Sequence, residues 1–157
     1  SPYKTNLAAS FPWVEAGPDG LSVDAGAHAN GGYFNFAPGN IYVGGGMWMP
    51  HRPRLEAFRR AVRDEPERVR AALWEPGFVA WFGEAAPHEM LKRVPPGYDA
   101  DHPLAELFRW KDVVFGRALS DREVLSAALP DLIADGYTAA LPVFRFLSTI
   151  RADAAAT

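Results

Sequence analysis

Residues 31–50 read GGYFNFAPGNIYVGGGMWMP and set the architecture of the N-terminal half of the chain. Residues 33–36 and 41–43 are aromatic or β-branched for the most part, as is typical of strands. The intervening APGN fits a type II turn, because Pro38 presets φ at the second position and Gly39 accepts the positive φ at the third. The stretch therefore predicts a β-hairpin.

Three consecutive glycines, residues 44–46, continue the second strand of this hairpin without side chains. Glycine inside a strand is typical of a β-bulge, or of a place where another backbone or a ligand approaches closely. We favour the bulge. Residues 3–11 have the composition of a further strand.

Helical signals dominate the chain after residue 52. Leu55, Phe58 and Val62 recur at helical spacing, and Ser120 with Glu123 forms a capping box. Prolines that suit a first helical turn predict helices that begin at Pro53, Pro66, Pro76, Pro103 and Pro130. Residues 113–119 have strand character. Since strands cluster early and helices late, we expect an α+β fold in which an antiparallel sheet from the N-terminal half packs against helices from the C-terminal half.

The composition fits a single domain over residues 1–157, with 48% hydrophobic and 22% charged residues, as in an ordinary soluble protein. A net charge of -3 argues against general binding to nucleic acid or to acidic membranes. The absence of cysteine suits a reducing compartment, so we expect a cytoplasmic location. No stretch approaches the roughly 18 apolar residues that would span a bilayer.

Neither a metal site nor a cofactor is expected. The four histidines show no HxH or HExxH spacing, and the carboxylates follow no calcium-loop pattern. The chain also lacks GxSxG and the GxxxxGK[ST] phosphate loop.

Lysine is rare in this chain. Of its sixteen basic residues only Lys4, Lys92 and Lys111 are lysine, and each lies in a short polar or aromatic motif. An ammonium is a compact point charge that arginine does not replace, although chance usage explains the pattern equally well. If the three serve one ligand, their ammonium groups should converge within roughly 10 Å, about one Debye length.

Two cations are expected on apolar helix faces, namely Arg59 and Lys111. A buried cation needs a carboxylate, carbonyl groups or an anionic ligand, so we expect both to be buried and to contact a carboxylate or an anion. Pairing with a carboxylate is one interpretation, with the candidates Asp101, Asp112 and Glu106. The other is a pocket that holds a phosphate or carboxylate between Lys4, Arg59, Lys92 and Lys111. If Arg59 is buried, Arg59→Leu need not be disruptive provided that the hydrophobic side chain fills the space, whereas removal of its partner alone should destabilise the fold by about 3–5 kcal/mol.

The densest polar stretch runs from Lys92 to His102. A histidine beside carboxylates and a lysine is what acid–base chemistry needs, because its neighbours can hold its pKa near neutrality. A purely structural interpretation is equally concrete. Asp99 or Asp101 would cap the helix at Pro103, and His102 would bond a backbone carbonyl.

Several motifs in this order resemble one protein family. They are SPYKTN at the start, the hairpin of residues 31–50, the LxxxR of residues 55–59, LKRVPPGYDADHPLAELFRWKD at residues 91–112 and LPVFRFL at residues 141–147. Together they resemble the uncharacterised family known as domain of unknown function 2461, which is found widely in bacteria and in fungi. Family members usually carry a helical stretch before SPYKTN, so the resemblance implies that this chain is the C-terminal, larger part of a longer protein.

The resemblance implies no activity, because none is assigned to the family. It places eight polar residues on family motif positions, namely Lys4, Arg59, Lys92, Tyr98, Asp101, His102, Arg109 and Lys111. We therefore expect a domain that binds a small anionic ligand. If the domain is an enzyme, it would use acid–base chemistry on that ligand. The catalytic pair would be His102 and Asp101. The ligand-binding candidates are Lys4, Arg59, Lys92, Arg93, Tyr98, Arg109 and Lys111.

Two other classes of function stay open. A non-catalytic interaction module would turn its aromatic residues toward a protein partner or toward the N-terminal segment that the resemblance implies. The candidates are Trp48, Trp74, Trp81 and Trp110. Nucleic-acid binding is the weakest class, because the net charge is negative and no basic stripe interleaves with aromatic residues.

Overall fold

A computed structural model describes residues 7–12 and 31–151 of the chain. Its strands form one antiparallel sheet in the order β1-β2-β3-β4. They are β1 (Leu7–Pro12), β2 (Gly31–Ala37), β3 (Asn40–Met47) and β4 (Val113–Ala118). The first three come from the N-terminal half, as predicted, whereas β4 follows much later and completes the sheet at the free side of β3.

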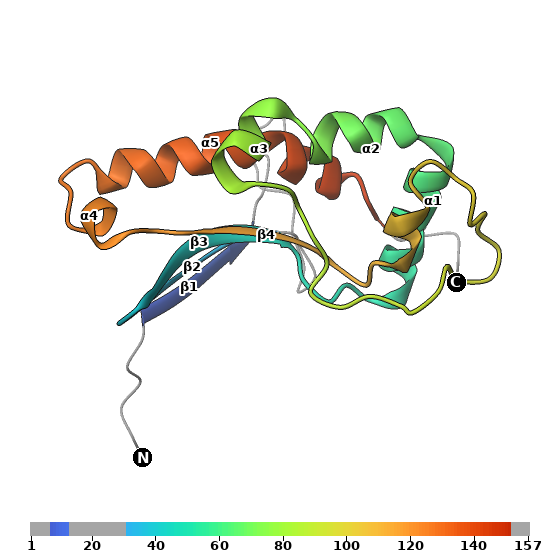
Figure 1. The fold of residues 1–157 in the computed structure, drawn as a ribbon, viewed down its shortest axis with the longest axis horizontal. Helices are drawn as coiled ribbons and strands as arrows, with labels where there is room; N and C mark the ends of the chain where they lie inside the picture. Colours follow the sequence, from blue (N-terminus) through green and yellow to red (C-terminus); the bar gives the residue numbers. More distant parts are fainter. Residues whose placement is uncertain (1–6, 13–30, 152–157) are drawn as a thin grey trace, which may run out of the picture.

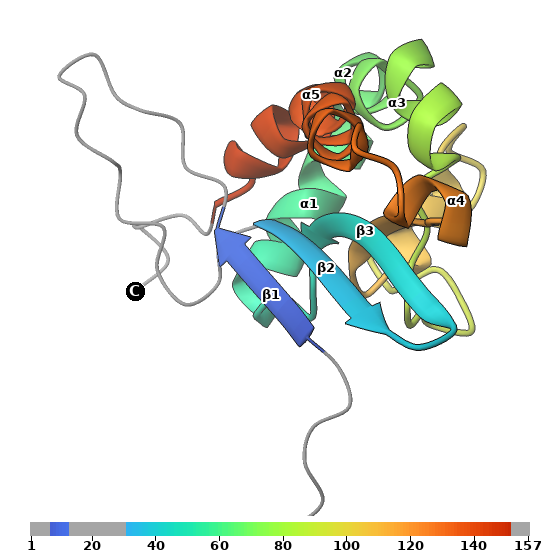
Figure 2. The same cartoon turned by 90° about the vertical axis from the view of Figure 1, so that its left-hand side faces the viewer.

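Helices pack against this sheet, so the α+β fold is confirmed. They are α1 (Arg52–Asp64), α2 (Pro66–Leu73), α3 (Pro76–Phe82), the 3₁₀ helix η1 (Ala105–Arg109), α4 (Asp121–Val124) and α5 (Leu129–Ser148). Figures 1 and 2 show α3 and α5 over one face of the sheet, with α1 beyond the end where β3 finishes. The apolar face of the sheet is buried against α3 and α5.

The hairpin between β2 and β3 forms as the sequence predicts. Ala37 pairs with Asn40 across the turn, and Gly39 adopts a φ of 74°, as the third position of a type II turn requires. The side-chain amide of Asn35 donates a hydrogen bond to the Asn40 carbonyl at 2.7 Å. This bond ties the turn to the strand that leads into it.

The predicted bulge at residues 44–46 is wrong. These glycines pair continuously with β4, and no residue is inserted. The reason is close approach of backbones, the alternative interpretation of the same glycines. A Cβ atom on Gly44 would lie 2.3 Å from the Phe115 carbonyl oxygen, and one on Gly45 would lie 2.6 Å from the Gly31 carbonyl oxygen. Real Cβ atoms do not come this near to a carbonyl oxygen, so the strands can lie together here only without side chains.

Aromatic rings fill the space between the sheet and the helices. Phe115 on β4 meets Phe78 of α3 edge-to-face, with ring centroids 5.0 Å apart, and Phe144 of α5 at 5.6 Å. Phe78 and Phe144 are fully buried or nearly so. Burial of each such ring contributes about 1.5–3 kcal/mol, and edge-to-face contact adds about 0.5–1.5 kcal/mol.

The helix predicted to begin at Pro103 is wrong in length and type. Only the five-residue η1 forms, and the chain becomes extended at Trp110. The cause is a long-range pairing, because the Lys111 backbone N–H donates to the Glu89 carbonyl at 3.0 Å and Met90 bridges to Trp110. Pairing with residues 89 and 90 thus ends the helix before Lys111, so Lys111 does not lie on the apolar face of η1.

The capping box at the start of α4 is confirmed. Ser120 Oγ accepts from the Glu123 backbone N–H at 3.1 Å, and Glu123 Oε1 accepts from the Ser120 backbone N–H at 3.0 Å. Arg117 Nη2 lies 2.6 Å from the other oxygen of Glu123. These donors hold the Glu123 carboxylate in its ionised form.

We expect Glu123 to titrate below the ordinary range of glutamate. The bond from the Ser120 backbone N–H, then the Ser120 hydroxyl and the charge of Arg117, lower the pKa of Glu123. A lowered folded-state pKa means that the ionised carboxylate stabilises the fold above the unfolded-state pKa, and that this stabilisation is lost as the pH falls through the folded-state pKa. An NMR titration should show the low pKa, and Ser120→Ala should raise it. A pKa at or above that of a free glutamate would contradict the prediction.

Candidate functional site

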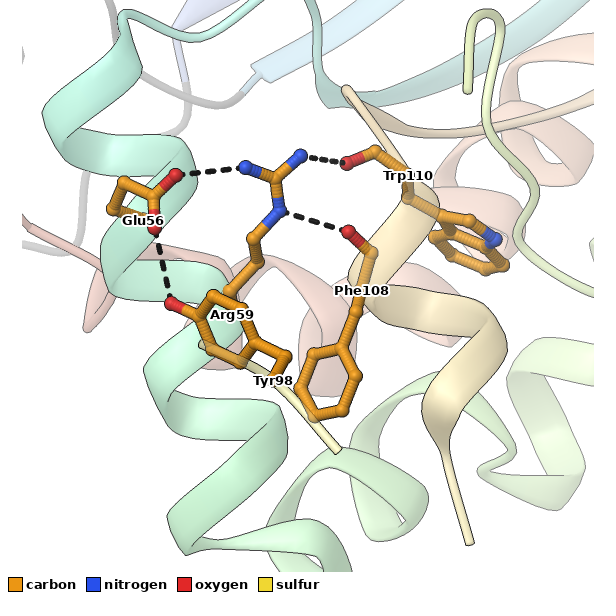
Figure 3. A network of polar contacts seen from close by, with 5 residues as sticks. All are labelled: Glu56, Arg59, Tyr98, Phe108 and Trp110. Atoms are coloured by element: carbon orange, nitrogen blue, oxygen red, sulfur yellow. Dashed lines mark hydrogen bonds and ion pairs between the residues drawn. The ribbon is translucent and has the colours of Figure 1, made fainter. Parts of the chain in front are cut away.

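Arg59 is the centre of a buried polar network between α1 and η1 (Figure 3). The residue is 5% exposed, and its Nε donates to the Phe108 carbonyl at 2.9 Å. Nη2 donates to the Trp110 carbonyl at 3.3 Å, and Nη1 forms an ion pair with Glu56 Oε1 at 2.8 Å. The predicted burial of Arg59 and its contact with a carboxylate are confirmed, but the carboxylate is Glu56, one helical turn away on α1.

Tyr98 completes this network. Its hydroxyl donates to Glu56 Oε2 at 3.0 Å, and its ring packs on Phe108 with centroids 4.7 Å apart. Burial foremost, and the bond to Glu56, raise the pKa of Tyr98. Since each nitrogen of the Arg59 guanidinium already has a protein partner, the network is complete without a ligand. It fixes the start of the segment 108–112 against α1.

The prediction that Lys111 is buried is wrong. Its side chain is 45% exposed, and Nζ lies 3.7 Å from Glu89 Oε2. The expected contact with a carboxylate is therefore present, at the surface. Lys111 lies in a bend between η1 and β4, so the apolar helix face on which its burial was predicted does not extend to it.

Residues 86–91 run antiparallel to residues 109–114, with bridges from Ala86 to Val114 and from Met90 to Trp110. The Leu91 backbone N–H donates to the Arg109 carbonyl at 2.6 Å, and Arg109 Nε donates back to the Leu91 carbonyl at 2.9 Å. Lys92 and Arg93 follow directly in the chain after Leu91, the residue that Arg109 bonds. We call four cations on this paired segment or directly after it in the chain the basic ridge, namely Lys92, Arg93, Arg109 and Lys111.

The charges of the basic ridge are only partly balanced. Arg109 pairs with Glu106 at 3.0 Å and Lys111 pairs with Glu89. Lys92 and Arg93 are exposed, and within residues 7–12 and 31–151 neither makes an ion pair. Among the described residues, two cations of the basic ridge thus have a carboxylate partner and the other two have none.

His102 and Asp101 do not form a hydrogen-bonded pair. His102 Nδ1 accepts from the Leu104 backbone N–H at 2.9 Å, and its ring meets Phe108 edge-on at 5.2 Å. The Asp101 backbone N–H donates to Asp99 Oδ1 at 2.9 Å. Because Nδ1 is an acceptor, the ring hydrogen of neutral His102 lies on Nε2. His102 Nδ1 thus accepts from a backbone N–H group, whereas the structural interpretation expected a bond to a backbone carbonyl, and no side chain caps η1.

Asp112 is a buried charge to which the sequence analysis gave only the role of a partner for Arg59 or Lys111. It is 1% exposed, and its Oδ1 accepts from the backbone N–H groups of His88 at 2.6 Å and Glu89 at 3.4 Å. Its other oxygen, Oδ2, has no hydrogen-bond partner among the described residues. A buried acceptor left without a donor costs about 1–3 kcal/mol. The sequence feature that could have indicated this burial is the position of Asp112 directly before an apolar strand.

An exposed aromatic pair adjoins Asp112. The Trp48 and His88 rings lie 4.5 Å apart, and Trp48 is 59% exposed. Met47 pairs with Val113, so Trp48 follows β3 at the sheet end where Asp112 precedes β4. Met49 is also 59% exposed and has a φ of 40°, which is unusual for a residue with a side chain. Of the four tryptophans predicted to face a partner, Trp48 is exposed, whereas Trp110 is buried and Trp74 and Trp81 pack partly against the core.

Lys4 lies outside the described residues, so the convergence of the three lysines stays a prediction. Among the described residues, no three histidine, aspartate or glutamate side chains are grouped as metal ligands. No helix in that part of the chain combines the length and the apolar character needed to cross a membrane.

The fold is an α+β domain with one four-stranded antiparallel sheet, and the Arg59 network lies between α1 and η1. The chain belongs to the family described as "Conserved hypothetical protein (DUF2461)", whose model matches residues 1–146. The comparisons with curated proteins and with solved structures found no match.

Proposed function

We propose that this domain binds a small anionic ligand at the basic ridge. The observation that carries the proposal is the bonding of Arg109 to Leu91, the residue directly before Lys92 and Arg93. Guanidinium groups bind carboxylate and phosphate groups through two parallel hydrogen bonds, and lysine adds a point charge. An anion on the ridge would neutralise the two cations that have no counter-charge in the described part of the chain.

The remaining candidate residues support this site in different ways. Arg59 and Tyr98 hold the segment that carries Arg109 and Lys111, so we assign them a positioning role. A catalytic form of the proposal rests on His102 alone, since Asp101 is not its hydrogen-bond partner. We propose a cytoplasmic location, because a chain without cysteine suits a reducing compartment.

We expect phosphate, sulfate or acetate to raise the thermal stability of the chain in a saturable manner. A ligand at a hundred times its Kd adds about 2.7 kcal/mol to the free energy of unfolding. The double variant Lys92→Ala/Arg93→Ala should lose this increment. The double variant Arg70→Ala/Arg122→Ala, with two arginines on α2 and α4, is the control for loss of positive charge and should retain it.

Sodium chloride at matched ionic strength separates specific binding from general screening. Equal stabilisation of the wild type and the Lys92→Ala/Arg93→Ala variant would place the effect elsewhere and contradict the proposal. Stabilisation by sodium chloride equal to that by phosphate, sulfate or acetate would also contradict the proposal.

A second candidate function is protein interaction, which the exposure of Trp48 and Met49 favours. Aromatic residues and methionine are enriched at interfaces. If this candidate holds, Trp48→Ser should abolish association with a partner protein while the thermal stability stays unchanged. Nucleic-acid binding is our weakest candidate, because two carboxylates accompany the ridge and the net charge is -3.

A further inference from the structure

We infer that the outer edge of β1 is a dimer interface, at which the β1 strands of two copies of this chain pair antiparallel and join their two sheets into one. β1 is the last strand on its side of the sheet, since its one strand partner among the described residues is β2. Figure 2 shows β1 at the front margin of the sheet, with the helices above and behind it. This surface is separate from the basic ridge and from Trp48, so the inference does not rest on the proposed function.

The two edges of the sheet differ in how they are covered. At the β4 edge, the backbones of Ala86 and Val114 exchange two hydrogen bonds of 2.9 Å, whereas the described residues supply no such cover at the β1 edge. An uncovered edge presents unpaired N–H and C=O groups, and natural proteins protect such edges with charged residues, proline or bulges. Residues 7–11 read LAASF and include none of these residue types. The β1 edge is therefore suited to pairing with another strand.

A second copy of β1 is the strand that fits this edge best. When a peptide adds to a sheet edge, pockets for its side chains give specificity, but the middle of β1 has only the small residues Ala8, Ala9 and Ser10. A copy needs no such pockets, because a two-fold axis perpendicular to the sheet sets the two strands antiparallel and repeats every contact. Neither β1 nor β2 contains a charged residue, so no like charges would oppose one another across the new pair.

The symmetry also selects the register of this pair. Directly opposite residues of an antiparallel pair point to the same side of the sheet, so an odd-numbered residue must oppose an odd-numbered one. The longest ladders that satisfy this rule are centred on Ala9 or on Ser10, and the second would include Pro12, which has no N–H to donate. In the ladder centred on Ala9, Ala8 opposes Ser10 of the other copy. Leu7, which is 68% exposed, opposes residue 11 of the other copy and would be covered there.

Sedimentation equilibrium of two matched double variants tests both the interface and its register. One strand pair buries less than the standard interface of about 1,600 Å², so we expect the wild type to dimerise reversibly with a Kd on the order of 10–100 μM. Ala8→Lys/Ser10→Lys sets lysine opposite lysine twice in each dimer and should weaken dimerisation about tenfold or more. Ala8→Lys/Ser10→Glu sets lysine opposite glutamate instead and should dimerise at least as tightly as the wild type.

Both substituted positions are exposed, so both variants should fold, as thermal unfolding would verify. Mixing Ala8→Lys/Ser10→Lys with Ala8→Glu/Ser10→Glu should restore a dimer that neither variant forms alone. A wild type that stays monomeric up to about ten times the expected Kd would overturn the inference, and would show that another segment or partner covers this edge. Dimerisation of both lysine-containing variants as in the wild type would place the interface elsewhere. Failure of Ala8→Lys/Ser10→Glu to dimerise would refute the register centred on Ala9.

Discussion

Replacing Gly46 with alanine is expected to destabilise the protein by about 2–6 kcal/mol, the sum of two effects. Gly46 has a φ of 131°, a region that residues with a side chain avoid at a cost of about 1–3 kcal/mol. Its new Cβ would also lie 2.1 Å from the Val113 carbonyl oxygen. Relief requires movement of the β4 backbone, and overpacking of this kind costs about 1–3 kcal/mol. Urea denaturation should therefore show a much lower midpoint, or no folded state.

Gly39→Ala is the matched control in the same hairpin. Gly39 also has a positive φ, of 74°, but an added Cβ would meet no atom within 4 Å. Only the backbone cost applies, about 1–2 kcal/mol. Equal losses in the two variants would show that close approach of β4 contributes nothing, and would refute our account of the three glycines.

Arg59→Leu is expected to destabilise the protein by about 3–5 kcal/mol, the range found when one member of a buried charge network is removed. From the sequence, a hydrophobic replacement was expected to be tolerable, provided that Arg59 is buried and the new side chain fills the space. The structure changes this expectation, since Arg59 also satisfies the carbonyls of Phe108 and Trp110. Leucine fills space but donates no hydrogen bond, so both carbonyls would lose their donor.

Two further variants calibrate this effect in urea denaturation. Glu56→Gln should cost about 1 kcal/mol, because its side chain is 33% exposed and the bonds from Arg59 to the carbonyls remain. Arg70→Leu removes a surface ion pair with Glu67 and should stay within about 0.5 kcal/mol of the wild type. If Arg59→Leu is no more harmful than Arg70→Leu, the network does not stabilise the fold.

The parts of the fold that local chemistry controls could be predicted from the sequence. The turn at Pro38 and Gly39, the proline-led starts of α1, α2 and α3, and the capping box of Ser120 and Glu123 all formed as expected. Each depends on residues within four positions of one another. Short-range rules of φ preference and capping are therefore sufficient for them.

The errors concern residues whose structure depends on distant segments. Gly44 and Gly46 are explained by the approach of β4 and Gly45 by that of β2, and η1 ends early because residues 109–112 pair with residues 89–91. Neither partner can be identified from a single sequence, because strand register leaves no local signal. Propensity was thus overridden by tertiary contacts.

The candidate site was predicted only as a region. The run from Lys92 to Lys111 does supply the basic ridge, and the burial of Arg59 followed from helical periodicity. The burial of Asp112 was missed, since an aspartate next to a lysine suggests a surface ion pair. Its place inside the protein comes from backbone donors on residues 88 and 89, which no spacing rule relates to it.

The position of β4 late in the sequence affects how the chain folds. β1, β2 and β3 are neighbours in both sequence and space, whereas residues 48–112 separate β3 from β4. Hairpins form within microseconds, but closing a long loop costs entropy before any contact compensates for it. The helices α1, α2 and α3 shorten that loop as they form. The docking of β4 should therefore limit the folding rate, and until it occurs the exposed edge of β3 is the place where two unfinished chains would associate.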